Sequence, residues 1–463
     1  MNAAVGAGVS LRLAEFVTRT PDAQIPQHAL QAAARVVLDA TGVMRAASGL
    51  APEVQPFIAI AADGGAGTAR VLGTRLNVRT ELAALANGAM AHSLDYEDAF
   101  DGAPLHPNAS LVPAVLALAQ THGPVTGRAF LAAIAMGCDV ACRIALSLRQ
   151  RLEEGGWYPP PILGAFGAVA GAAHILQLTP RQLLDAWSML LLQNSCAGEI
   201  KHDRDTVIRA VREAFPAQAA VQVALLARSG VRGFDAPLEG RDGFYRLFAS
   251  SRYDADTLFR DLGQHWHIAN LSFKPWPSCR GTHAAIECAL EVRRQLDWRL
   301  IRHISIEGCE VHRMLAAPAA RKSAPHTAID AKFSLPFTVA CALATGKVDL
   351  DSFTAEALAH VDVLTLARLA SFHQRDDWGV EQAVSGAVEI TLADGGRLRH
   401  EVLAPKGAPT RPLTAPRLVA KFVDCAGRAQ HALPAEQASA LAQRLLLLEN
   451  ADDAGALIAT TAP

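Results

Sequence analysis

Apolar residues recur at intervals of three and four along the first half of the chain. This spacing gathers apolar side chains on one face of an α-helix. It predicts helices over residues 11–20, 27–47, 80–94, 110–123, 127–148 and 162–176, and the helical pattern extends to about Phe259. The segment 127–148 is apolar almost all round, so we expect a buried central helix there.

Three glycines, Gly164, Gly167 and Gly171, recur every three or four residues within the segment 162–176. A nucleotide-binding loop is one interpretation of such a run. No strand precedes these glycines, however, and their pattern is not GxGxxG, so close packing between helices is favoured.

The pattern changes after Asp261. Apolar and polar residues alternate over 301–312, which is typical of a strand, and 386–404 predicts two strands joined by a turn at 394–396. A helix is expected at 330–346, and further helices at 416–427 and 435–450 follow a Pro-rich connection. We therefore predict a mainly α fold with three parts: an all-α large domain over 1–265, a smaller α+β domain over 266–405, and C-terminal helices over 406–463 that pack back on the large domain.

The composition narrows the class of protein. Hydrophobic residues make up 51% of the chain and charged residues 19%, so a large core is expected and disorder is not. The net charge is −2, and no basic excess or charge run points to nucleic acid or to a membrane surface.

The cysteines and the apolar stretches indicate a reducing, cytoplasmic location. The 8 cysteines include no CxxC pair, so neither a disulfide framework nor a zinc ribbon is predicted. Cys138 and Cys142 are expected to be core thiols. The first residues lack the basic start and long apolar run of a signal peptide, and stretches such as 130–140 are expected to be too short or too interrupted to cross a bilayer.

Four polar islands interrupt the apolar background. The first, AHSLDYEDAFDGAPLHPNAS at 91–110, packs two histidines and four acids together. The other three are GGWYPPPILGAFG at 155–167, KHDRDTVIRAVREAFPAQAA at 201–220 and FKPWPSCRGTHAAIECAL at 273–290. The first two islands supply acids, histidines and a phenol, and the last two supply arginines and lysines.

Two kinds of site could use these residues. His92 and Asp95 stand three residues apart and could bind a metal from one helix face, but HExxH is absent and His106 lies beyond a Gly/Pro loop. Removal of a proton next to a carboxylate needs instead a base of tuned pKa and cations that stabilise the developing charge. The islands fit this second chemistry better, so we expect no metal and a pocket for a small polycarboxylate.

The chain resembles the MmgE/PrpD family, which includes 2-methylcitrate dehydratase, cis-aconitate decarboxylase and iminodisuccinate epimerase. The resemblance runs through most of the chain and is carried by five motifs: AHSLDYEDAF with HPNASLVPAVLAL, AFPAQAAVQVALLARSGVRGFDAPLEGRDGFYRLF, KPWPSCRGTHAAIECAL, DAKFSLPFTVACALATGKV and RPLTAPRLVAKF. It implies a large all-α domain formed by both chain ends, an inserted α+β lid, a homodimer, and an active site between the domains without metal or organic cofactor.

The family's site residues carry over in part. Asp95, His106 and His283 match the family's motifs, whereas three other positions depart from its pattern. Ala99 stands where relatives have threonine, Tyr158 stands in place of a histidine, and Arg212 stands in place of a lysine. Lys201, eleven residues earlier, is a candidate to offset the last change.

These departures bear on the reaction. Tyrosine is a poor base at neutral pH but a competent acid, and arginine suits a carboxylate clamp. We expect a cofactor-independent lyase, with dehydration first, epimerisation second and decarboxylation third. A carboxylate-binding homologue without turnover and a metal-dependent hydrolase are the alternatives from other classes.

The predicted roles divide into two sets, and the other acids of the first island are expected to be solvated or supporting groups. The predicted catalytic residues are Asp95, His106, Tyr158 and His283; the predicted substrate-binding residues are Arg212, Lys274, Arg280 and Lys201; the supporting acids are Glu97, Asp98 and Asp101.

Overall fold

The first half of the chain is helical in the computed structural model, which describes residues 8–203 and 205–460. Its helices are α1 (Val9–Arg19), α2 (Gln27–Leu50), α3 (Gln55–Asp63), α4 (Thr80–Ser93), α5 (Pro107–Thr121), α6 (Gly127–Ser147), α7 (Pro159–Ile175), α8 (Pro180–Leu190), α9 (Ile208–Val211), α10 (Ala214–Arg228), α11 (Phe244–Ala249) and α12 (Ala255–Phe259). A small antiparallel hairpin, β1 (Ala66–Arg70) with β2 (Asn77–Val78), interrupts them and was not predicted from the sequence.

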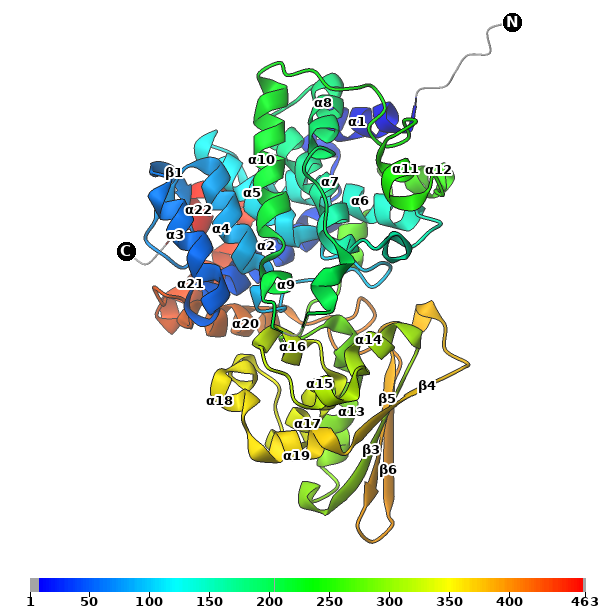
Figure 1. The fold of residues 1–463 in the computed structure, drawn as a ribbon. Helices are drawn as coiled ribbons and strands as arrows, with labels where there is room; N and C mark the ends of the chain where they lie inside the picture. Colours follow the sequence, from blue (N-terminus) through cyan, green and yellow to red (C-terminus); the bar gives the residue numbers. More distant parts are fainter. Residues whose placement is uncertain (1–7, 204, 461–463) are drawn as a thin grey trace, which may run out of the picture.

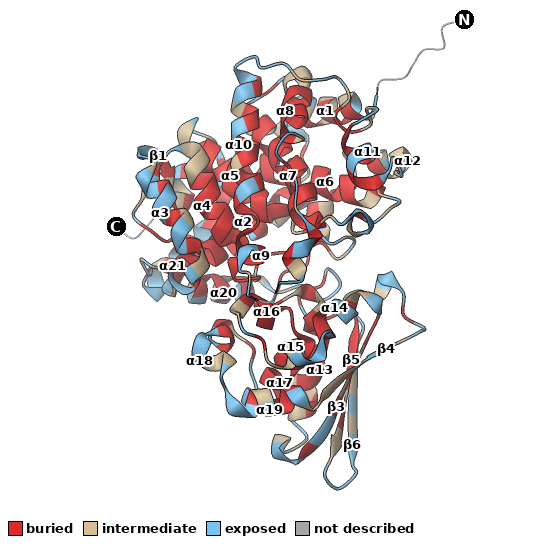
Figure 2. Cartoon of the chain, viewed as in Figure 1, coloured by how far each residue is buried: buried red, intermediate tan, exposed pale blue. Residues whose placement is uncertain are grey.

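Helix α6 lies at the centre of this bundle, as the sequence predicts. It packs against α7, α5 and α2, and its residues are buried along almost its whole length (Figure 2). Thr126 caps its first turn by accepting a hydrogen bond from the Ala129 amide. The helix is in fact long and apolar enough to cross a membrane, against the expectation that this stretch is too short, but 89% of its most apolar window is buried inside the protein. Burial of this kind is typical of a core helix.

The glycines of α7 serve helix packing. A Cβ on Gly167 would meet the backbone of Gly137 on α6, and one on Gly171 would meet the side chains of Leu111 and Val115 on α5. Helices α6 and α7 therefore approach each other closely because neither has a side chain at the point of contact. This arrangement agrees with the packing interpretation of the three glycines.

Residues beyond 266 add a four-stranded sheet in the order β4-β3-β5-β6 (Figure 1). The strands are β3 (Ile301–Gly308), β4 (Ala370–Gln374), β5 (Gly386–Leu392) and β6 (Arg397–Val402). The pair β3–β4 is parallel, and β3–β5 and β5–β6 are antiparallel. The predicted strands at 301–312 and 386–404 are present, although β3 ends at Gly308, and Gly395 takes a φ of 86° in the predicted turn.

The helices of this segment are α13 (His283–Arg293), α14 (Arg313–Ala316), α15 (Ala319–Ser323), α16 (Ala328–Lys332), α17 (Leu335–Thr345), α18 (Ala355–Leu358) and α19 (Val361–Arg368). Helix α13 packs on β5 and β6. The single helix predicted over 330–346 is divided into α16 and α17, because Ser334 caps a new helix by accepting a hydrogen bond from the Phe337 amide.

The C-terminal helices pack on helices of the first half of the chain. Helices α20 (Ala415–Gly427) and α21 (Ala435–Leu446) pack on α2, and α22 (Ala454–Ala459) packs on α5, so the red end of the chain lies among the blue helices in Figure 1. The fold is mainly α, as predicted. The division into domains at residues 265 and 405, and the pairing of two copies, remain predictions.

Candidate active site

The first polar island forms the loop between α4 and α5. Helix α4 ends at Ser93, and Asp95 then takes the left-handed conformation with a φ of 50°, which few residues other than glycine, asparagine and aspartate adopt readily. Helix α5 begins at Pro107, directly after His106, because proline suits the first helical position. The loop thus places Asp95 and His106 at the facing ends of two buried helices.

A second segment closes over this loop. The amide and carbonyl of Ala99 exchange hydrogen bonds of 2.9 and 2.8 Å with Ser272. This pairing brings Lys274 over Asp95, with Nζ 2.5 Å from Oδ1 of Asp95 and 3.1 Å from its backbone oxygen. At Ala99, where relatives have a hydroxyl, the side chain is buried beneath this contact.

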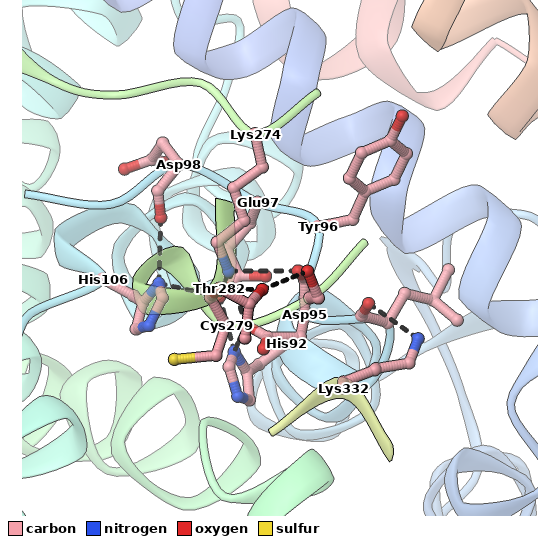
Figure 3. A network of polar contacts seen from close by, with 12 residues as sticks. His92, Asp95, Tyr96, Glu97, Asp98, His106, Lys274, Cys279, Thr282 and Lys332 are labelled. Atoms are coloured by element: carbon pink, nitrogen blue, oxygen red, sulfur yellow. Dashed lines mark hydrogen bonds and ion pairs between the residues drawn. The ribbon is translucent and has the colours of Figure 1, made fainter. Parts of the chain in front are cut away.

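Glu97 lies at the centre of the cluster (Figure 3). Its Oε1 is 2.5 Å from Nδ1 of His92, 3.0 Å from Nδ1 of His106 and 4.0 Å from Nζ of Lys274. Nδ1 of His106 also lies 3.0 Å from the backbone oxygen of Asp98. Since both neighbours of this nitrogen are acceptors, it carries the proton, and Nε2 of His106 holds the free lone pair.

The charges of the cluster follow from burial and from these contacts. Burial by itself raises the pKa of Asp95 and is the largest single influence, but the Lys274 ammonium together with His92 and His106 lowers that pKa to about 2. Burial and the Arg212 charge lower the pKa of His92 to about 3. Asp95 is therefore ionised and His92 is neutral at physiological pH.

Four groups of the cluster could in principle bind a metal. One ligand atom each from His92, Asp95, Glu97 and His106 lie within 4.8 Å of one another. Lys274 is a poor neighbour for a divalent ion, however, because its ammonium already holds Asp95 Oδ1 and stands 4.0 Å from Glu97 Oε1. The protonated Nδ1 of His106 is not a ligand either. The donor set therefore suits an ion-paired acid/base site better than a metal site.

Removal of metal ions gives a direct check of this assignment. Dialysis against EDTA is expected to change neither the melting temperature nor any turnover, because Lys274 rather than a metal balances the carboxylates. Differential scanning fluorimetry and metal analysis before and after dialysis measure the effect. A lower melting temperature that a divalent ion restores would contradict the assignment.

The second and third islands meet beside this cluster. Nε of Arg209 on α9 donates a hydrogen bond of 3.2 Å to Oη of Tyr158, just before α7. The guanidinium of Arg212 lies 5.0 Å from the centre of the Tyr158 ring. Within the described part of the chain, Nη2 of both arginines is buried without a hydrogen-bond partner. Unpaired buried N–H groups are costly, so they mark a place where an anion could bind.

The remaining predicted residues differ in their surroundings. Lys201 Nζ is 5.9 Å from the centre of the Tyr158 ring. Arg280 donates two hydrogen bonds of 3.0 Å to Asp101. His283 is buried against Trp276, and Nε2 lies 3.1 Å from the Ser278 oxygen of its own loop. The structure thus pairs Asp95 with Lys274 directly and brings His106 against Glu97 of the same cluster, with Tyr158 and Arg212 alongside. The catalytic role of His283 remains a prediction.

For the other acids of the first island, the sequence left open a solvated or a supporting place. Glu97 and Asp98 are each 1% exposed rather than solvated. Burial raises the pKa of Asp98 to about 7, while its Oδ2 accepts a hydrogen bond of 2.9 Å from Asn108. His92 and Arg209 were not given a role. The sequence feature that could have indicated a site role for Glu97 is its position two residues after Asp95. An acid in a loop, however, is usually solvated.

Comparisons with known proteins identify the family of the chain. Residues 11–255 match the model of the MmgE/PrpD N-terminal domain, and residues 276–447 match that of the MmgE/PrpD C-terminal domain. The chain is 24% identical to a cis-aconitate decarboxylase-like protein, oryM, of Aspergillus oryzae over 97% of this chain and 96% of that protein. It is also 24% identical to cis-aconitate decarboxylases of Aspergillus terreus, over 91% of this chain and 89% of that enzyme, and of Mus musculus, over 73% and 70%.

Proposed function

Because the chain belongs to the MmgE/PrpD family, we propose that it is a lyase that acts on a small aconitate-like di- or tricarboxylate by proton transfer next to a carboxylate. The observation that carries the proposal is the contact between Glu97 Oε1 and Nδ1 of His106, at 3.0 Å. It fixes the tautomer of His106 and leaves Nε2 as the base.

The proposed site binds the substrate through its carboxylates. Arg209 and Arg212 each have a buried Nη2 without a partner in the described chain, and Arg280 has an unpartnered Nη1. Guanidinium groups suit carboxylates because they donate in a planar fork. An acid with two or three carboxylates could pair with several of these donors at once.

In the leading form of the proposal, the reaction is a dehydration. Nε2 of His106 removes a proton from the carbon next to a carboxylate, and the electron pair of that C–H bond forms the new C=C bond. The C–O bond to the β-hydroxyl breaks, and Tyr158 gives its proton to the leaving oxygen, which departs as water. Arg209 donates to Oη of Tyr158, so it would stabilise the phenolate that remains.

Decarboxylation is the second candidate, and it is favoured by the relatives, which are cis-aconitate decarboxylases or a cis-aconitate decarboxylase-like protein. In that reaction protonated His106 would give a proton to carbon while a C–C bond breaks and CO₂ leaves. Epimerisation ranks third, because it needs two acid/base groups on opposite faces of one carbon.

Incubation with citrate, 2-methylcitrate and cis-aconitate in D₂O, followed by NMR and CO₂ detection, tests the proposal. A new double bond without gas supports dehydration. CO₂ with one deuterium in the product supports decarboxylation, and deuterium in recovered substrate alone supports epimerisation. Binding of every acid without any change would favour a carboxylate-binding protein and overturn the proposal.

The Tyr158→Phe variant separates the first two reactions. Loss of the phenolic proton is expected to slow dehydration by roughly 10²-fold or more, because hydroxide is a poor leaving group without an acid. Decarboxylation, which expels no hydroxide, is expected to change much less. Tyr253→Phe is the matched control, since Tyr253 lies outside the cluster. Its ring stacks on that of Tyr245, with the two ring centroids 3.9 Å apart. Equal loss in both reactions would contradict the role of Tyr158.

A further inference from the structure

Three buried lysines bind three successive backbone oxygens of the loop between α4 and α5, residues 94–106, which we call the catalytic loop. Nζ of Lys332 donates to the oxygen of Leu94 at 2.8 Å, Nζ of Lys274 donates to that of Asp95 at 3.1 Å, and Nζ of Lys421 donates to that of Tyr96 at 2.7 Å. The sequence holds only seven lysines, and these three come from three separate segments. Figure 3 shows Lys332 and Lys274 approaching the loop from different sides.

These three contacts lie where the backbone leaves the end of α4. Leu94 is the C-cap residue of α4, so its carbonyl has no partner within the helix and a cation can satisfy it. The carbonyls of Asp95 and Tyr96 lie just beyond the helix. The chain then leaves the helix through the left-handed φ of Asp95, at 50°. Aspartate adopts this conformation more readily than most residues, but it is still not the preferred one for a residue with a side chain, so the surrounding contacts decide whether it persists. The three ammonium groups donate hydrogen bonds to the carbonyl of Asp95 and to the carbonyls of the residues before and after it.

Lys332 differs from the other two lysines. Lys274 pairs with the Asp95 carboxylate at 2.5 Å, and Lys421 pairs with that of Asp39 at 2.7 Å. No carboxylate of the described chain forms an ion pair with Lys332, which is 2% exposed and lies 4.8 Å from the Phe353 ring centre. A buried cation without an ion pair is costly, so its contact with Leu94 calls for an explanation other than charge pairing.

We infer that Lys332 is a positioning residue: it fixes the Leu94 carbonyl, and thereby the left-handed conformation of Asp95, only when α16 is docked on the catalytic loop. Its effect on turnover rests on the proposed function, whereas its effect on the Asp95 backbone does not. Lys332 touches no reacting atom in this role. It makes the placement of the Asp95 carboxylate depend on a segment more than two hundred residues away in the sequence.

The same segment also holds the other side of the site. Arg321 on α15 pairs with Asp330 on α16 and donates hydrogen bonds to the backbone oxygens of His202 and Asp203 at 2.7 and 3.0 Å. That loop leads into α9 and Arg209. The segment 319–332 therefore contacts both the loop that carries Asp95 and the loop that leads to Arg209 beside Tyr158.

The Lys332→Met variant tests the inference, with Lys406→Met as the matched control on a half-exposed lysine. Methionine keeps the length and apolar stem but removes the donor. With whichever acid the wild-type enzyme turns over, kcat is expected to fall about 100-fold, because small misplacements of a catalytic group have effects of this size, while KM changes little. A crystal structure of the variant is expected to show Asp95 at a negative φ.

Two results would overturn the inference: a kcat equal to that of the Lys406→Met control, or an Asp95 φ that stays near its value of 50° in the variant. The second measurement needs no substrate. If the wild-type protein turns over none of the acids, the proposed function fails, and the crystal structure still decides the role of Lys332.

Discussion

Replacement of His106 by asparagine is expected to lower kcat by roughly 10²- to 10⁴-fold, the usual contribution of a general base. The amide nitrogen of asparagine can take the place of Nδ1 and still donate to Glu97, which lies 3.0 Å from that nitrogen. The lone pair of Nε2, however, has no counterpart in asparagine. The variant therefore removes the proposed base and keeps the contact that orients it.

His122 offers a control for this substitution at the opposite end of the same helix. His106 precedes the first residue of α5, and His122, which is exposed, follows its last. The His122→Asn variant is expected to retain the wild-type kcat, and both variants are expected to bind citrate in a thermal-shift assay. A His106→Asn enzyme with kcat close to that of the His122→Asn enzyme would rule out His106 as the base.

Replacement of Lys274 by methionine is expected to lower the free energy of unfolding by about 3–5 kcal/mol at neutral pH, the usual cost of one partner lost from a buried ion pair. The Asp95 carboxylate is fully buried and loses its contact at 2.5 Å. Urea denaturation measures the change. The loss of activity is expected to be complete, because Asp95 must then bind a proton or unfold the loop.

The pH dependence of this variant has a definite sign. In the wild-type protein the folded pKa of Asp95 is about 2, below its unfolded value, so its stabilisation is present above the unfolded pKa and is lost as the pH falls through 2. Without Lys274, burial raises the folded pKa above the unfolded value. The Lys274→Met variant is therefore expected to gain stability relative to wild type as the pH is lowered from neutral toward the unfolded pKa.

The double variant Asp95→Asn, Lys274→Met completes the test. It removes the charge that the single variant leaves unpaired, so it is expected to be more stable than Lys274→Met and insensitive to pH in this range. If the single variant is equally unstable across this pH range, or if the double variant is no more stable, Lys274 does not act by balancing Asp95.

The sequence predicted those parts of the site that follow from patterns between residues close together in the chain. Helical periodicity located α4 and α5, and the polar run between them located Asp95 and His106. The cations of the fourth polar island pointed to Lys274. Alternation located β3 and the β5–β6 hairpin, whereas β4 was missed because its five residues, ASFHQ, follow a helix directly and are only partly buried.

Other parts could not be predicted, because they depend on contacts between distant segments. Glu97 is buried only because two histidines and Lys274 surround it. Lys332 stands between Asp330 and Ser334, and nothing in that run indicates that its ammonium reaches Leu94, 238 residues earlier. A single sequence does not encode such pairs in its periodicity.

The order in which a ribosome makes the chain gives the lysine contacts a consequence for biosynthesis. Lys421 is synthesised 325 residues after Tyr96, whose backbone oxygen it binds. At about 5–20 residues per second, that delay lasts roughly 15–65 s. The nascent helices α4–α7 can bury their apolar faces during this time, but the loop between α4 and α5 has none of its three lysines at first and acquires them one at a time. The catalytic loop is thus translated early and reaches its native conformation late.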